Sequence, residues 1–239
     1  GRFLAASTGY AEQGEQARGV VSIWDLTESR PIRTYEGHND VVDALVFLDD
    51  GAWLASAGGD RKIHLWNAET GEVRKILVGH RNAVRCLALD ASRGLLASGA
   101  SDRSVKVWDL ASGAEKAAIE GRGEVRALAF SPVNGALAVA QDGADPRIWD
   151  LGLMLPVAEL AGHTLNVCSL TFTPDGRLIS AGWDKSIRVW DVKTQRSLMT
   201  LNRHAEAVMG LAIEANGNVL ASASRDRTIR LWLADPIDR

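Results

Sequence analysis

The pattern of apolar and polar residues along this chain repeats every 41 or 42 residues. In the clearest copy, an apolar run at residues 83–89 is followed by a short run of small apolar residues at 95–100. An alternating run at 105–108 and a mostly polar run at 115–119 come next. Short runs of this kind are typical of β-strands, and their falling hydrophobicity predicts four strands of decreasing burial.

The segments between these runs predict how the strands pair. Residues 90–94, 101–104 and 109–113 are rich in Asp, Ser and Gly and are too short to contain a crossover helix. Successive strands must therefore pair as antiparallel hairpins, so that one copy of the pattern forms one four-stranded sheet. Because such a sheet cannot bury both of its faces alone, we expect the copies to stack face to face as blades around an axis.

Six tryptophans end the third run of each copy and define the number of copies. They are Trp24, Trp66, Trp108, Trp149, Trp190 and Trp232. So uniform a repeat favours one continuous stack, and we predict a single domain over residues 1–239. Its blades are expected at about residues 1–35, 36–77, 78–119, 120–160, 161–201 and 202–239.

Each regular copy begins with a Gly-His pair, as at Gly79-His80, and ends with Trp-Asp, as at Trp108-Asp109. In its length and in this order of motifs, the repeat resembles the WD-repeat (WD40) family of β-propellers. The resemblance covers residues 31–232 fully and residues 3–24 in part. It implies an all-β WD40 β-propeller with six recognisable blades of four antiparallel strands.

The first and last blades are incomplete in this sequence. Residues 1–7 match the second strand of a blade, and no fourth strand is recognisable after Trp232. Propellers of the resembled family most often have seven blades and close by pairing the two chain ends within one blade. We therefore expect a segment of a longer chain, from a propeller of seven or more blades; trimming at both ends is the alternative. We also predict a polar loop at residues 8–19, where other blades have a tight turn.

Blade four departs from the repeat. Arg122 replaces the histidine, Val139 replaces a serine and Gly143 replaces an aspartate of the regular copies. Asp145-Pro146 also removes a backbone donor just before the third strand. We expect this blade to be the least stable. Substitution of Asp142 or Asp145 for the missing aspartate is the alternative that would give it equal protection.

The composition is that of an ordinary globular protein, with 46% hydrophobic and 24% charged residues. A formal net charge of -3 gives no bulk electrostatic reason to bind nucleic acid or an anionic membrane. No apolar run approaches the roughly 20 residues of a membrane span, and no signal peptide is visible. Cys86 and Cys168 fall in equivalent strands of blades that are not neighbours, so we expect no disulfide. These features favour a cytoplasmic protein.

Histidine, serine and aspartate recur together in four blades, each time followed by the closing tryptophan. The sets are His38, Ser56, Asp60 and Trp66; His80, Ser98, Asp102 and Trp108; His163, Ser180, Asp184 and Trp190; and His204, Ser222, Asp226 and Trp232. One such set could be the triad of a hydrolase. A catalytic centre needs one copy, whereas a structural tie needs one per blade, so the repetition favours structure. The resemblance implies a hydrogen-bonded tetrad between the loop entering the first strand and the turn after the second.

The sequence predicts neither a metal site nor a cofactor. The histidines other than His64 lie a whole blade apart, and the two cysteines lack the spacing of metal ligands. No glycine-rich phosphate loop follows a strand and opens a helix, because Gly58-Gly59 sits in a hairpin turn. We therefore expect a protein that is not an enzyme.

The remaining candidate site is one face of the blades. In the resembled family the aspartate turns and the Gly-His loops share the top face, around the mouth of the central channel, where partners bind. Positions beside the first-strand valine and beside the tetrad aspartate are expected to point into that mouth. In this sequence the candidate partner-binding residues are Asp43, Arg85, Glu124, Arg126, Asn166, Trp183, Met209 and Arg225, together with Asp142. The three arginines predict an acidic partner, and Trp183 an apolar anchor.

Two functions are compatible with these features. The favoured one is a non-enzymatic scaffold or sensor that presents its top face to a protein or peptide, with neither nucleic acid nor membrane as a partner. The alternative is a regulatory propeller, autoinhibitory or sensing, attached to a catalytic or nucleotide-binding domain of the same longer chain. A protease or ATPase motif beside this segment would favour the second.

Overall fold

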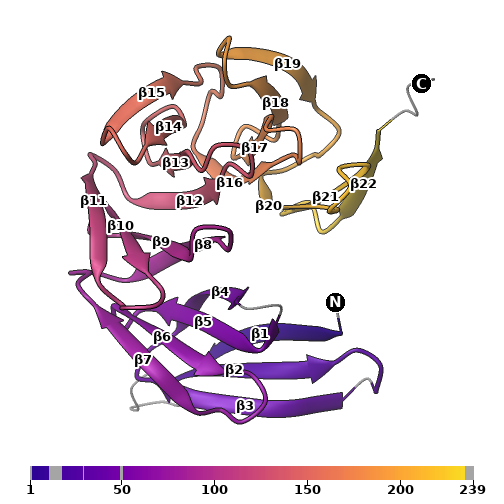
Figure 1. Ribbon diagram of the computed structural model, residues 1–239. Coiled ribbons are helices and arrows are strands. Elements are labelled where there is room, and N and C mark those ends of the chain that lie inside the picture. The colour runs from indigo at the N-terminus through magenta and orange to yellow at the C-terminus, as the bar shows by residue number, and fades with distance from the viewer. Residues whose placement is uncertain (1, 11–17, 29, 49–50, 235–239) are drawn as a thin grey trace. The chain divides into compact units, whose positions relative to one another are not determined.

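The computed structural model describes residues 2–10, 18–28, 30–48 and 51–234. These residues form 22 strands in six antiparallel sheets of three or four strands, and no helix among them is long and apolar enough to cross a membrane. Each sheet is one blade (Figure 1), which confirms the predicted all-β architecture of six propeller blades. The chain divides into two compact units, residues 1–120 and 121–239, with three blades in each; the single-domain interpretation stays a prediction.

The first unit contains blades one to three. Its strands are β1 (Phe3–Tyr10), β2 (Arg18–Asp25), β3 (Arg30–His38), β4 (Val42–Leu48), β5 (Trp53–Gly58), β6 (Lys62–Asn67), β7 (Val73–Val78), β8 (Val84–Asp90), β9 (Leu95–Ala100), β10 (Ser104–Asp109) and β11 (Glu115–Glu120). The last four agree within one residue with the strands that the hydrophobic pattern predicts. Every neighbouring pair is antiparallel, as the short connections require.

The second unit contains blades four to six. Its strands are β12 (Val125–Phe130), β13 (Leu137–Gln141), β14 (Arg147–Asp150), β15 (Leu155–Glu159), β16 (Val167–Phe172), β17 (Leu178–Gly182), β18 (Ile187–Asp191), β19 (Arg196–Leu201), β20 (Val208–Ile213), β21 (Val219–Ser224) and β22 (Ile229–Leu233). The sheets follow chain order from the first strand of each blade to the last, so each blade is a simple meander.

Within each unit, the third strand of a blade packs into a buried cluster that it shares with the next blade. In the first unit Ile63 and Leu65 of β6 share a buried cluster with Leu96 and Trp108 of blade three. In the second unit Ile187 of β18 lies in a cluster with Val208 and other residues of blade six. Burial of one such aliphatic side chain contributes about 1.5–3 kcal/mol, so the repeat is held together mainly by these contacts between blades.

The outermost strands carry little of the core, as predicted, but they are not uniformly polar. Every residue of β19 except its last is exposed. Leu198 and Met199 of this strand are 54% and 55% exposed. The polarity of an outermost strand therefore predicts its exposure to solvent only roughly.

The predicted loop at residues 8–19 is shorter than expected. The ladder between β1 and β2 extends to the pair Tyr10 and Arg18, so the backbone at both ends of the predicted loop is strand. Threonine and tyrosine favour extended backbone, and backbone pairing continues past the last apolar position. The rest of that loop, residues 11–17, lies outside the described residues.

Four hairpin turns share one backbone conformation that places the tetrad aspartates. The residue after the aspartate has a positive φ, at 66° for Arg61, 70° for Arg103 and 68° for both Lys185 and Arg227. Its N–H donates to the carbonyl three residues earlier, as from Arg103 to Ala100 at 3.2 Å. A tight turn closed by one left-handed residue is a common three-residue hairpin loop. The aspartate side chain is thereby held at the end of the hairpin, facing the loop that enters the same blade.

Blade four has a different turn and a weaker tie. Arg122 is exposed, Val139 is buried, and the positive φ moves to Gly143, at 71°. Neither Asp142 nor Asp145 substitutes for the tetrad. Instead the Gln141 amide donates to the Gly123 carbonyl at 3.2 Å, which connects the second strand to the entry loop.

We predict that β12–β15 exchange their amide hydrogens faster than β8–β11 and β16–β19. A tetrad contributes several buried hydrogen bonds, and the loss of one partner of such a bond costs about 1–3 kcal/mol, which corresponds to about 5- to 150-fold faster exchange through local opening. Hydrogen exchange followed by mass spectrometry measures this directly. Equal protection of blades four and five would contradict the prediction and would mean that the hydrogen bond from Gln141 to Gly123 suffices.

Candidate functional site

The structure brings together all four side chains of each recurring set. In blades two, three, five and six, the histidine Nε2 lies 2.7–2.8 Å from the serine Oγ, and the tryptophan indole donates to the same Oγ at 2.7–3.0 Å. The histidine Nδ1 lies 2.8–3.1 Å from the aspartate Oδ2. Each tetrad thus links the entry loop, the second strand, the hairpin turn and the third strand of one blade.

Three hydroxyl side chains that the sequence analysis missed extend these tetrads. Ser104, Ser186 and Thr228 each stand two residues after the aspartate and donate to its Oδ1 at 2.6–2.8 Å. The backbone N–H after the histidine often donates to Oδ2, as from Arg81 at 2.7 Å. The repeated spacing Asp-x-Ser/Thr in three of the four copies was a signal that could have identified these hydroxyls.

The pKa values of the four tetrad aspartates are lowered by the hydrogen bonds that they accept, whereas burial lowers the pKa of two of the histidines, His80 and His163. Burial opposes the charge of Asp102, but donors from Arg81 and Ser104 outweigh it and lower its pKa to about 2. Burial lowers the pKa of His80 and of His163, against the opposite effect of the partner aspartates. A neutral imidazole can accept at one nitrogen and donate at the other, which matches the roles of serine and aspartate.

The tetrads resemble a catalytic triad in connectivity but not in accessibility. The serines Ser56, Ser98, Ser180 and Ser222 are between 0% and 1% exposed. A substrate carbonyl could not approach an Oγ that is covered by the blade and already accepts the indole N–H. The same arrangement in four blades provides structural ties rather than a nucleophile.

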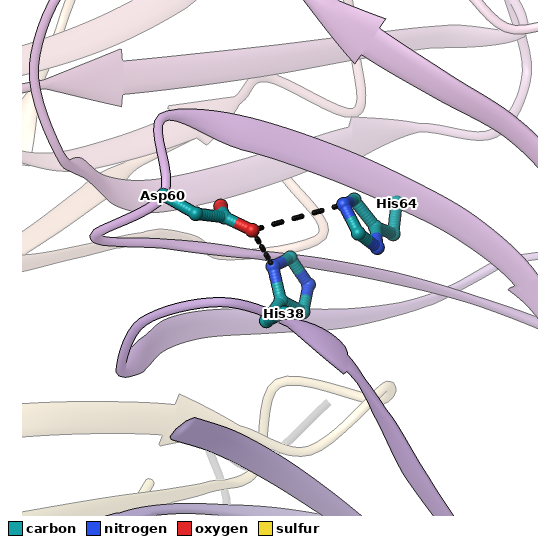
Figure 2. Close-up of side chains that lie close together, drawn as sticks. All are labelled: His38, Asp60 and His64. Atoms are coloured by element: carbon teal, nitrogen blue, oxygen red, sulfur yellow. Dashed lines mark hydrogen bonds and ion pairs between the residues drawn. The ribbon is translucent and has the colours of Figure 1, made fainter. Parts of the chain in front are cut away.

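Blade two carries an aromatic cluster that the sequence analysis did not find. Figure 2 shows His64 beside the tetrad pair of His38 and Asp60. Its ring stacks on that of His38 with centroids 3.9 Å apart, and its Nδ1 lies 2.7 Å from the Tyr35 hydroxyl. Tyr35 in turn stacks on Trp66 at 4.4 Å. The cluster joins blade one to the tetrad of blade two.

His38, Asp60 and His64 have the residue types of a metal site, and their candidate ligand atoms lie within 4.8 Å of one another. The two imidazole planes, however, are stacked and only 19° from parallel. A metal ion binds in the plane of an imidazole, so an ion in the plane of one ring would lie far out of the plane of the other. Both nitrogens of His38 are also engaged, with Asp60 and Ser56. The geometry therefore fits a stacked histidine pair better than a metal centre.

In the first unit, two residues of the predicted binding face form an ion pair. The Arg85 guanidinium donates to Asp43 at 2.9 Å and to the Ser101 hydroxyl at 2.9 Å. Arg85 follows the first valine of blade three, and Asp43 holds the same position in blade two. The guanidinium is therefore partly neutralised by the blade before it.

In the second unit, the Asp142 carboxylate accepts hydrogen bonds from other residues of the predicted binding face. Arg126 makes two hydrogen bonds to its carboxylate, at 2.6 and 2.8 Å, and lies 3.4 Å from Glu124. The Asn166 amide donates to the same carboxylate at 2.8 Å and accepts from the Gly143 N–H. The aspartate thus braces blade four against blade five, at the place where blade four lacks its tetrad.

Trp183 and Arg225 form a second cluster on the same face. Trp183 is 46% exposed, and the Arg225 guanidinium lies 4.7 Å from the centroid of its ring. The Cys168 thiol lies beneath this pair: burial raises its pKa, and the Trp183 side chain and the charges of Arg126 and Arg225 oppose that rise. Met209 is 39% exposed and holds the position in blade six that Arg126 holds in blade four.

These contacts change the predicted electrostatics. Arg85, Arg126 and Arg225 together were expected to attract an acidic partner, yet the first two are each paired with a carboxylate. Arg225 stacks on an aromatic ring instead and has no carboxylate partner within the part of the chain that the structure describes. The three arginines therefore differ in how much charge they can offer to a partner.

Removing a tetrad aspartate should destabilise the fold. We expect Asp102→Ala and Asp60→Ala each to lower the free energy of unfolding by about 1–3 kcal/mol, because the histidine and backbone N–H groups lose a buried acceptor. Urea denaturation measures the loss, and Glu72→Ala, at an exposed position, is the control. A variant that loses a specific hydrolytic activity but keeps wild-type stability would disprove the structural assignment.

His64 should make the first unit sensitive to acid. Burial and the neighbouring His38 lower its pKa to about 4, whereas an unfolded chain has a histidine pKa near 6.5. The unfolded state then binds the proton more readily, so stability is complete above about pH 6.5 and is lost as the pH falls towards 4. Burial also lowers the pKa of His80, which adds to the same trend in this unit.

The variant His64→Gln should lose less stability than the wild type between pH 7 and pH 5. We expect a difference of about 1 kcal/mol, which allows for solvent screening of the full effect. Urea midpoints at the two pH values measure it. An unchanged pH dependence would show that His64 does not titrate in this window.

A family model from known proteins matches four stretches of this chain, each about as long as one copy of the repeat. The model of the family described as WD domain, G-beta repeat (WD40) matches residues 29–67, 71–109, 154–191 and 195–232. The unmatched residues between the second and third matches contain the first three strands of blade four, the copy in which Arg122, Val139 and Gly143 replace tetrad residues. The matches cover more than half of the chain.

Several curated proteins share short stretches with this chain. A DDB1- and CUL4-associated factor 13 from Dictyostelium discoideum is 37% identical over 54 residues, which are 23% of this chain and 12% of that protein. A Notchless protein homolog from Arabidopsis thaliana is 37% identical over 51 residues, 21% of this chain and 11% of that protein. The small ribosomal subunit protein RACK1 from Candida albicans is 34% identical over 61 residues, 23% of this chain and 19% of that protein. Each of these alignments thus spans less than a fifth of the related protein. Because the family model matches more than half of the chain, this chain belongs to the WD40 family of G-beta repeats.

Proposed function

We propose that this chain is a non-enzymatic scaffold that presents the top face of its blades to a protein or peptide partner. The top face is the side that holds the aspartate turns and the loops entering the first strands. The observation that carries the proposal is the contrast between two sets of polar residues. The tetrads are buried and serve the fold, whereas the residues beside them are exposed or half-buried and connect to one another across blades.

Rigidity of the turns supports this function. The tetrad fixes the turn and the entry loop of a blade together, so side chains on them are already ordered before a partner arrives. Ordering an interface side chain on binding costs about 0.5–1.5 kcal/mol, and a preformed face avoids that cost. Exposed apolar residues on this face include Leu165 at 58%, Trp183 at 46% and Met209 at 39%. Such residues beside arginines have the composition of binding hot spots.

The names of the similar proteins support a scaffold function. They include an associated factor of DDB1 and CUL4 and a ribosomal subunit protein. A pre-mRNA-processing factor from Saccharomyces cerevisiae also matches, at 34% identity over 56 residues. These names point to protein assemblies but to no single compartment, so cytoplasmic localisation stays a prediction from cysteine usage.

Substitutions on the top face should abolish binding of peptides selected against this protein. Peptide ligands would be selected from a displayed library of random 12-residue sequences, and their affinities measured by fluorescence anisotropy. We expect Leu165→Asp and Met209→Asp to weaken binding by about tenfold or more, which is about 1.4 kcal/mol. Leu198→Asp is the matched control, because this leucine is similarly exposed on the outermost strand β19.

Two results would contradict the proposal. One is equal weakening by the top-face and outer-strand variants, and the other is a library that yields no ligand sensitive to the top face. Thermal melting of each variant would show that the fold is retained.

A further inference from the structure

We infer that Arg225 and Trp183 together form a binding site for one carboxylate group of an acidic partner segment, with an adjacent apolar side chain of that segment on Trp183. The inference rests on the proposed function, because it assumes that a partner binds to the top face. It adds the chemistry of the partner and the two residues that recognise it.

The first support is the geometry of the pair. Arg225 immediately precedes the turn aspartate of blade six, and Trp183 immediately precedes that of blade five. The guanidinium lies 4.7 Å from the indole centroid, and Trp183 remains 46% exposed. Stacking on an aromatic ring uses the face of a guanidinium and leaves its N–H edge available for a carboxylate.

The second support is the balance of charge around the pair. Arg126 is neutralised by Asp142 at 2.6 Å, and Lys185 pairs with Glu206 at 3.4 Å. The Asp226 carboxylate next to Arg225 is directed to His204, at 2.8 Å from its Nδ1. Within the described residues, the positive charge of Arg225 therefore has no carboxylate partner. The acidic groups on the same face are engaged with other residues.

The single positive charge of Arg225, unpaired within the described residues, indicates which class of ligand fits the site. A phosphate group carries close to two charges and is best bound by several cations, whereas one guanidinium matches one carboxylate through two parallel hydrogen bonds. Glu124 and Asp142 would repel the repeated phosphates of a nucleic acid. An aspartate or glutamate side chain within a peptide fits both the single charge and the proposed partner.

The third support is the residue type at this position of the repeat. The residue before the turn aspartate is Gly59 in blade two and Ser101 in blade three, so the turn requires no large side chain. Trp183 does not fill the core there, since nearly half of it is exposed. Its exposed surface can receive an apolar side chain next to the carboxylate.

The experiment is a double-mutant cycle with the selected peptides. Each acidic peptide would be paired with an analogue in which Asp or Glu is replaced by Asn or Gln. We expect Arg225→Gln and the peptide replacement each to weaken binding by about tenfold, and the two together to weaken it hardly further, because both remove the same ion pair. Trp183→Leu should also weaken binding, whereas Arg227→Gln, an exposed arginine of the same turn, should not.

The outcomes separate the two proposals. Peptides that lose affinity with Leu165→Asp but bind Arg225→Gln as well as the wild type would keep the top face as the binding surface and overturn the carboxylate site. Stronger binding of a phosphoserine analogue than of the acidic peptide would also overturn it. Peptides indifferent to every top-face variant would overturn the proposed function itself.

Discussion

The structure depends on a buried imidazole that bridges a carboxylate and a hydroxyl in each of blades two, three, five and six. In blade three, His80 connects Asp102 of the hairpin turn to Ser98 of the second strand, and Ser98 accepts from Trp108 of the third. Hydrophobic contacts between blades supply most of the stabilisation, but they do not determine where a polar turn lies. Buried polar groups must be paired, so the tetrad determines the turn and the entry loop together. This is why the same hairpin conformation recurs wherever the tetrad is complete.

Blade four shows what the fold does without that interaction. Its turn takes another conformation, and the Gln141 amide donates to the Gly123 carbonyl of its entry loop. The neighbouring blade then contributes: Asn166 reaches the Asp142 carboxylate that also holds Arg126. A polar network across blades thus takes over part of the role that a buried tetrad has elsewhere. Because this network is exposed, a bound partner could stabilise it or compete with it.

The periodicity of the sequence predicts the strands and the tetrads, because each depends on contacts within one copy that recur in every copy. Contacts between copies were harder to predict. Arg85 meets Asp43, and Arg225 meets Trp183, at a separation of one repeat, so residues at equal positions of adjacent blades are neighbours on the top face. A comparison of each residue with the one a period earlier would have indicated both pairs. The cluster of His64 and Tyr35 has no such signal, because it occurs in one blade only.

The division between a repeated framework and a variable face follows from the same geometry. With the aspartate held by the tetrad, the residue before it contributes little to the turn and can vary freely. It is Gly59, Ser101, Asp142, Trp183 and Arg225 in blades two to six. Substitutions there change charge and shape on the top face without disturbing the core, whereas substitutions one residue later remove a buried acceptor. Partner specificity is therefore expected to reside in the positions that the repeat leaves unconstrained, and a tryptophan and an arginine in adjacent blades are the largest departures from small residues among them.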